Sequence, residues 1–86
     1  MDFEFDSAKD VANRAKHHLP LAFGQRIFDD PFVDILPSFR PIDGEVRYKA
    51  VGMVDDKLFT AIYAERGAVT RLISVRRSNG REQRDY

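Results

Sequence analysis

Residues 45–77, EVRYKAVGMVDDKLFTAIYAERGAVTRLISVRR, decide the fold of this chain. Polar and apolar residues alternate over 45–53, which predicts a strand with one buried face. Residues 58–64 are nearly all apolar, which predicts a central strand covered on both faces. Residues 71–76 predict a third strand, with Ile73 and Val75 on one face. Because the connections are short, the three strands predict an antiparallel meander.

Two helical segments are expected before this sheet. Asp6 is a good N-cap, because its carboxylate accepts the unpaired N–H groups of a first helical turn. Apolar residues then recur at helical spacing and are expected to pack on the core; they are Ala8, Val11, Ala12, Ala15 and Leu19. A second helix is expected to begin at Pro20 and to end before Pro31.

The remaining segments complete an α+β arrangement. Residues 2–5 and 32–36 predict short strands, 37–44 predict a loop, and Asn79 with Glu82 predicts a capping box that opens a last helix. We therefore expect one domain over residues 1–86, with N-terminal helices packed on an antiparallel sheet and a short C-terminal helix. The side chains expected in the core include Phe3, Phe28, Phe59 and Ile62.

Composition restricts the classes of protein to which the chain can belong. It has 86 residues, 14 basic and 14 acidic, and no cysteine, so no disulfide framework or thiolate metal site is expected. The acidic start is unlike a signal peptide, and no apolar run is long enough to span a membrane. These features predict a cytoplasmic protein with no membrane partner.

The zero net charge is a sum of unlike segments. Residues 1–34 hold 4 bases and 7 acids, and residues 35–86 hold 10 bases and 7 acids, giving −3 and +3. Ten of the 14 bases are arginine, which suits contact with phosphate and stacking on bases. A neutral total therefore does not exclude a nucleic-acid partner.

The motifs of several enzyme classes are missing from the sequence. There is no glycine-rich phosphate loop, no zinc-type pair of histidines and no nucleophile elbow. On the predicted first helix, four polar residues share a side that is expected to be exposed; they are Lys9, Asn13, Lys16 and His17. Histidine titrates near pH 6.5 and can move protons, so these residues fit metal-free cleavage of RNA by its own 2′-hydroxyl.

The chain resembles the BrnT family of toxins from bacterial toxin–antitoxin modules. The resemblance rests on motifs in order along the chain: Phe5-Asp6-x-x-Lys9-x-x-x-Asn13-x-x-Lys16-His17, Phe28-Asp-Asp-Pro31, Asp43-Gly-Glu45-Val-Arg47, Gly52, Tyr63-Ala-Glu65-Arg66, Arg71-Leu-Ile-Ser-Val-Arg76-Arg77 and Arg81-Glu82-x-x-x-Tyr86. It departs from the family at His18, where glycine is usual, and at Phe5, Val75 and Asn79, where tryptophan, alanine and threonine are usual.

The resemblance implies a RelE-like fold and a ribonuclease toxin that arrests translation without a cofactor. It also implies a BrnA-like antitoxin with a ribbon-helix-helix domain, and promoter DNA bound only by the toxin–antitoxin complex. The catalytic candidates are His17, Glu45, Arg47, Arg76 and Arg77. The RNA-binding candidates are Lys9, Lys16, Lys49, Arg81 and Tyr86, and no metal site is expected.

Alternatives remain open for these residues and for the whole chain. Arg76 and Arg77 leave their strand in opposite directions, so one is expected to face RNA while the other pairs with a helix. Glu45 and Arg47 are either an ion pair or a base with its phosphate partner. The chain as a whole is either a ribonuclease or a non-catalytic RelE-like module that binds nucleic acid or a partner. A plain protein–protein adaptor ranks last, because it leaves the arginines unexplained.

Overall fold

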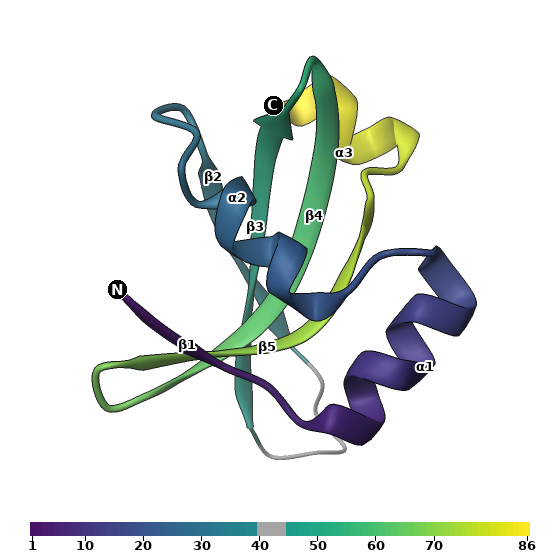
Figure 1. Ribbon diagram of the computed structural model, residues 1–86. Helices are drawn as coiled ribbons and strands as arrows, with labels where there is room; N and C mark the ends of the chain where they lie inside the picture. Colours follow the sequence, from purple (N-terminus) through teal and green to yellow (C-terminus); the bar gives the residue numbers. More distant parts are fainter. Residues whose placement is uncertain (40–44) are drawn as a thin grey trace.

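The computed structural model describes residues 1–39 and 45–86, so part of the predicted loop 37–44 lies outside the described residues. Along the chain the elements are β1 (Asp2–Glu4), α1 (Ser7–His17), the 3₁₀ turn η1 (Leu21–Phe23), α2 (Gly24–Ile27), β2 (Asp34–Phe39), β3 (Val46–Val54), β4 (Lys57–Arg66), β5 (Val69–Arg77) and α3 (Gly80–Asp85) (Figure 1).

The strands form one five-stranded sheet in the order β1-β5-β4-β3-β2. Strands β2 to β5 pair antiparallel, as expected, and β4 is the middle strand. The expectation of a wholly antiparallel sheet is wrong for β1, which pairs parallel with β5 through Asp2 and Val69. The α+β class is confirmed. The second strand is shifted from its predicted position: it begins at Asp34 and not at residue 32, and residues 37–39 continue β2 rather than begin the loop.

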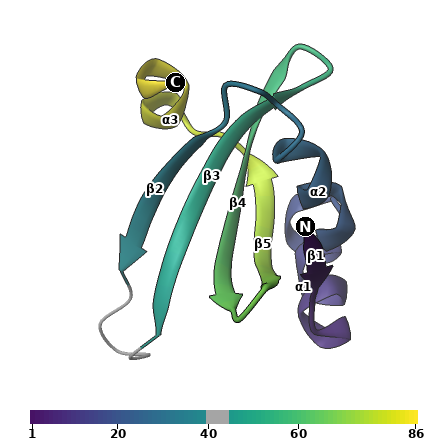
Figure 2. The ribbon, with the colours of Figure 1, turned by 90° about the vertical axis from the view of Figure 1, so that its left-hand side faces the viewer.

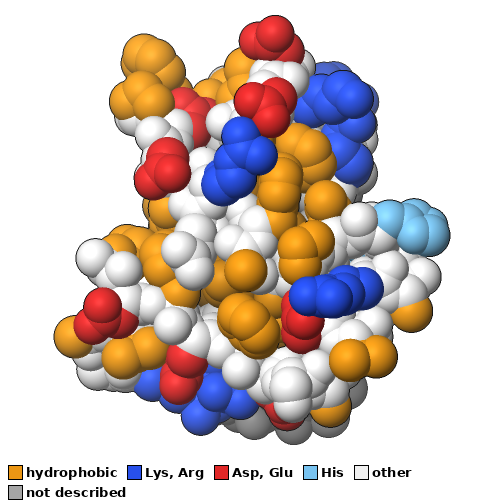
Figure 3. All heavy atoms as spheres, in the orientation of Figure 1, with side chains coloured by type: hydrophobic (Ala, Val, Ile, Leu, Met, Phe, Trp, Pro, Cys, Tyr) orange, Lys and Arg blue, Asp and Glu red, His pale blue; other side chains and the backbone are white. Residues whose placement is uncertain are grey.

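The helices lie on both sides of the sheet. Figure 2 shows α1 and α2 on one side and α3 on the other. We call the side that carries α2 the α2 face and the opposite side the α3 face. Figure 3 shows hydrophobic side chains gathered over the centre of the α2 face, with charged side chains mostly around it.

The core lies between the sheet and α2. Strand alternation turns Phe59 and Tyr63 of β4 toward Leu21 and Ile27, which are fully buried. Phe3 and Phe28 are partly buried against this cluster, so they are peripheral core. Gly52 is required here, because an added Cβ would lie 2.6 Å from the backbone oxygen of Ile27. Ile62 was expected in the core, and that prediction is wrong: it is half-buried and lines a hollow on the α3 face.

Helix α1 does not use its apolar stripe to reach the core. Of the residues predicted for that stripe, Leu19, which lies beyond the end of the helix, packs partly against the core. Asp10 and Asn13 are its buried residues, whereas Val11 is 68% exposed. The Asn13 amide donates to the Val75 oxygen at 2.9 Å and accepts from the Val75 nitrogen at 3.1 Å. Asp10 accepts from the Leu21 nitrogen at 2.7 Å. Polar anchoring to the edge of β5 therefore replaces the predicted apolar packing, and Asn13 is not on the exposed side.

A bulge interrupts the alternation of faces in β5, so the alternation predicted for that strand is wrong from Leu72 to Ser74. Ile62 pairs with Ser74, but the next residue, Tyr63, pairs with Leu72. Ile73 is the extra residue, so Leu72 and Val75 both lie in the core. Ile73 and Ser74 both line the hollow on the α3 face instead.

Turns and caps follow the local sequence. Asp6 caps α1, and Asn79 with Glu82 forms the predicted capping box of α3. His18 ends α1 in the left-handed region with φ 61°, a conformation in which glycine is least strained. Within the described residues, no helix has the length and apolar character to cross a membrane.

Candidate active site

A hollow of about 320 Å³ on the α3 face gathers three cations and a histidine from three elements. Lys16 and His17 come from the end of α1, Arg47 from β3 and Arg76 from β5. The rest of the lining is neutral: Ser38, Ile62, Ile73 and Ser74. In the described part of the chain, no acidic side chain lines this hollow. An anion is therefore the ligand whose charge it complements.

Local structure explains why these side chains meet. The hydrogen bonds of Asn13 fix α1 against the edge of β5, so the last turn of the helix lies beside the sheet. Arg47 lies one residue from Tyr48, which packs on the core, and therefore points to the α3 face. Thr60 of β4 lies between the core residues Phe59 and Ala61 and therefore points to the α3 face. Arg76 is the residue paired with Thr60, so it lies on the α3 face too.

The electrostatics of the hollow act directly on His17. Burial first, and then the positive charges of Lys16, Arg76 and His18, hold the pKa of His17 below its ordinary 6.5. At neutral pH the imidazole is mostly uncharged and can accept a proton. This makes His17 better suited to act as a base than as an acid.

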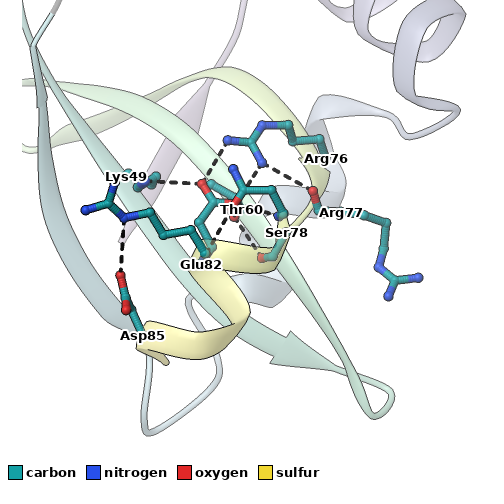
Figure 4. A network of polar contacts seen from close by, with 9 residues as sticks. Lys49, Thr60, Arg76, Arg77, Ser78, Glu82 and Asp85 are labelled. Atoms are coloured by element: carbon teal, nitrogen blue, oxygen red, sulfur yellow. Dashed lines mark hydrogen bonds and ion pairs between the residues drawn. The ribbon is translucent and has the colours of Figure 1, made fainter.

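A buried carboxylate holds Arg76, one of the residues that line the hollow (Figure 4). Glu82 of α3 is 4% exposed. Its oxygens accept two hydrogen bonds from Arg76, at 2.8 and 2.9 Å, and Oε2 lies 3.2 Å from Lys49 Nζ. Thr60 also donates to Glu82, at 2.9 Å. Two cations on neighbouring parts of the α3 face are therefore held by one acid.

These partners decide the charge state of Glu82. Burial raises its pKa, but hydrogen bonds from Arg76, the Asn79 backbone, Thr60 and Lys49 outweigh burial and lower the pKa to about 2. Glu82 is thus ionised at any physiological pH. The sequence indicated Glu82 only as a capping residue. Its second role depends on the register that brings Thr60 and Arg76 beneath α3, and no local motif encodes that register.

Arg77 lies apart from this group. Its guanidinium lies 5.3 Å from the ring centroid of Phe59, on the α2 face, and Figure 4 shows it pointing away from the network. The prediction that the two arginines diverge is confirmed, and Arg76 is the one that pairs with a helix. The structure therefore does not bring Arg76 and Arg77 to the same site.

Three other candidates lie outside the hollow. Arg81 is on the exposed surface of α3, with its Nε 3.9 Å from Asp85. The Tyr86 hydroxyl donates to Asp30, whose carboxylate also accepts from the Met53 nitrogen. Lys49 forms an ion pair with Glu82 and is not among the residues that line the hollow. Tyr86 is thus anchored at the end of α3, and its hydroxyl already has a partner.

Glu45 is an ion-pair residue in this structure. It lies just before β3 and accepts a hydrogen bond from Arg66 at 3.0 Å, and its other oxygen lies 3.8 Å from Arg47 Nε. The ion-pair alternative for Glu45 and Arg47 therefore has geometric support. Among residues 1–39 and 45–86, no group of three histidine or carboxylate side chains is placed to hold a metal ion.

The arrangement can bind a phosphodiester and accept a proton beside it. Lys16, Arg47 and Arg76 supply positive charge where a phosphorane would develop negative charge. His17 supplies an uncharged imidazole at the same hollow. Ser38 and Ser74 add hydroxyl groups that can donate to phosphate oxygens.

Comparison with known proteins identifies one family. The family model described as "Ribonuclease toxin, BrnT, of type II toxin-antitoxin system" matches residues 5–82. The matched span includes α1, all of β2 to β5 and Glu82, and so contains every residue that lines the hollow. None of the curated proteins matches the chain.

Proposed function

This chain belongs to the BrnT family of ribonuclease toxins of type II toxin–antitoxin systems, and on that premise we propose that the cationic hollow on the α3 face is its RNA-cleaving site. The observation that carries the proposal is the convergence of His17 with Lys16, Arg47 and Arg76 around one hollow that no acid of residues 1–39 and 45–86 lines. The reaction is endonucleolytic and needs no metal ion, because the hollow supplies its own base and cations.

In the proposed reaction His17 takes the proton of a 2′-hydroxyl, and the resulting oxygen attacks the adjacent phosphorus. The bond to the 5′-oxygen breaks, and water in the open hollow protonates the departing oxygen. Arg47, Arg76 and Lys16 stabilise the charge that develops on the phosphoryl oxygens. A positioned base contributes about 10²–10⁴ to the rate of such a step. Glu45 has no role as an acid or base in this proposal, because its oxygens face Arg66 and Arg47.

The wider biology of the chain follows from its family. We propose that cleavage arrests translation and growth in the cytoplasm, and that a BrnA-like antitoxin with a ribbon-helix-helix domain neutralises the toxin. Promoter DNA is bound only by the toxin–antitoxin complex in this proposal. The sheet with helices on both sides supports a RelE-like fold.

One observation favours a second candidate function, a module that binds RNA or a partner without cutting it. Two acids that contact lining residues are already paired, Glu45 with Arg66 and Glu82 with Arg76. Among the described residues that line the hollow, His17 is then the one group whose ordinary pKa lies near neutral pH.

Incubation of the purified protein with total RNA, with and without EDTA, tests the choice between the two functions. Cleavage to the same extent in both samples, with 2′,3′-cyclic phosphate or 3′-phosphate ends, supports the proposed reaction. RNA binding that weakens steeply with salt, without any cleavage, supports the non-catalytic module. Cleavage that EDTA abolishes contradicts the metal-independent reaction.

A further inference from the structure

A second, smaller hollow adjoins the proposed cleavage site. It measures about 190 Å³, and it shares Lys16, His17, Ile73 and Ser74 with the larger hollow. It extends along α1 and adds Lys9 and the small side chain of Ala12 to the lining. Here too, no acidic side chain of the described chain lines the hollow. The two hollows therefore form one continuous cationic surface that passes His17.

The geometry of α1 sets the length of this surface. Lys9 and Lys16 are seven residues apart, which brings them to the same side of the helix about 10 Å apart along its axis. The buried Asn13 lies between them and holds the helix to β5, so this row of cations cannot shift relative to the sheet. The bulge places Ser74 in both hollows. Lys9 and Lys16 thus extend from a helix that is held against the sheet, and Ser74 adds a hydroxyl to both hollows.

We propose that the smaller hollow is a subsite for a second phosphate of the substrate, which is a single strand of RNA that runs along α1. The phosphate to be cleaved occupies the larger hollow, and a neighbouring phosphate of the same strand lies beside Lys9. A single row of cations on one helix matches the phosphates of one strand. The inference rests on the proposed function, since it extends the same site.

Other cations near the site are less suited to hold that second phosphate. Lys49 is 3.2 Å from Glu82, and Arg81 lies on α3 with Asp85 as its neighbour. An RNA strand that turned toward α3 would have to compete with those carboxylates. Along α1 it meets Lys9, whose side chain is in none of the ion pairs that the structure gives for the described residues.

The inference can be tested with uncleavable 2′-O-methyl oligouridylates that contain either one or four phosphodiester linkages. Binding is measured by competition against a labelled oligonucleotide at several salt concentrations. For the four-linkage ligand, Lys9→Ala should lower the slope of log affinity against log salt by about 0.7. For the one-linkage ligand the variant should bind like the wild type, because a single phosphate occupies the larger hollow.

Two further variants control for loss of charge and for the shared lining. Lys57→Ala removes an exposed lysine at the start of β4 and should leave both affinities unchanged. Lys16→Ala should weaken both ligands, because Lys16 lines both hollows.

Two results would overturn the subsite. One is a Lys9→Ala protein that binds the four-linkage ligand as tightly as the Lys57→Ala protein does. The other is a Lys9→Ala protein that weakens both ligands equally. Failure of the proposed function gives a different result: the wild type then neither binds these ligands nor cleaves RNA, and the subsite is overturned together with it.

Discussion

The two faces of the sheet differ in the charges that line their hollows. On the α2 face, a hollow of about 660 Å³ has Asp29 and Glu65 beside its aromatic lining. A second, of about 310 Å³, is lined by the acids Asp29, Asp30 and Asp55 and by one cation, Arg26. On the α3 face and along α1, the hollows are lined by cations and by no acid of the described chain. The zero net charge therefore conceals a difference between the hollows of the two faces, although each face also carries charges of the other sign, such as Glu82 on the α3 face and Arg77 on the α2 face.

This difference follows strand alternation and not the division of the sequence into an acidic and a basic part. The acidic N-terminal segment supplies Lys9, Lys16 and His17 to the cationic surface. The arginine-rich C-terminal part sends Arg77 to the α2 face. Charge counted along a chain is thus a poor guide to charge on a surface when every strand feeds both faces.

The largest expected effect of a substitution near the α3 face is on stability. Glu82→Gln should lower the free energy of unfolding by about 3 kcal/mol, because Arg76 and Lys49 lose the charge of a buried partner. Urea unfolding measures this loss. Glu65→Gln is the control on the α2 face, where the exposed carboxylate should contribute little.

The pH dependence of the stability difference between wild type and Glu82→Gln gives a second check on the role of Glu82. The folded pKa, about 2, lies below the ordinary 4.5, so the carboxylate contributes its full stability above pH 4.5. The contribution is lost as pH falls toward 2. The difference in free energy of unfolding between wild type and Glu82→Gln should therefore decrease on acidification. A difference that stays constant down to pH 2 would contradict the role of ionised Glu82.

The next largest effect is expected on RNA cleavage, and it should differ between the neighbouring arginines, Arg76 and Arg77, which point to opposite faces. Arg76→Lys keeps the charge but loses the paired hydrogen bonds to Glu82, and RNA cleavage should fall by about 10². Arg77→Lys should stay within a few-fold of wild type, because Arg77 lies over Phe59 on the α2 face. Rates on one RNA substrate measure both, and a larger loss for Arg77→Lys would move the active site to the α2 face.

A smaller effect, about tenfold per pH unit, is expected in the pH profile of kcat/KM. The lowered pKa of His17 means that a base at this position is active at neutral pH and loses activity as pH falls through that pKa, below 6.5. A profile that instead declines as pH rises through the same range would make His17 the acid.

The sequence predicted the elements well where local patterns decide them. The β3–β5 meander, the Asp6 cap and the Asn79–Glu82 capping box were confirmed, because alternation and capping act within a few residues. The buried side of α1 was predicted wrongly. Its buried residues, Asp10 and Asn13, bind backbone groups of Leu21 and Val75, and such long-range hydrogen bonds leave no periodic pattern in the sequence.

For the site, residue types could be predicted but their assembly could not. Lys16, His17, Arg47 and Arg76 were all candidates from the sequence, and the structure brings them to one hollow. Their convergence depends on where α1 crosses the edge of β5 and on the bulge at Ile73. Arg77, one residue from Arg76, was separated from them by the pleat of the strand.

The adjacent histidines provide the most direct test of the central claim, that the cationic hollow is where RNA is cut. His17 lines both hollows, whereas His18 is an exposed helix cap with φ 61°. The measurement is RNA cleavage by His17→Gln and His18→Gly, each first shown to be folded. We predict a loss of about 10²–10⁴ for His17→Gln and wild-type cleavage for His18→Gly. Cleavage that survives His17→Gln unchanged would contradict the account.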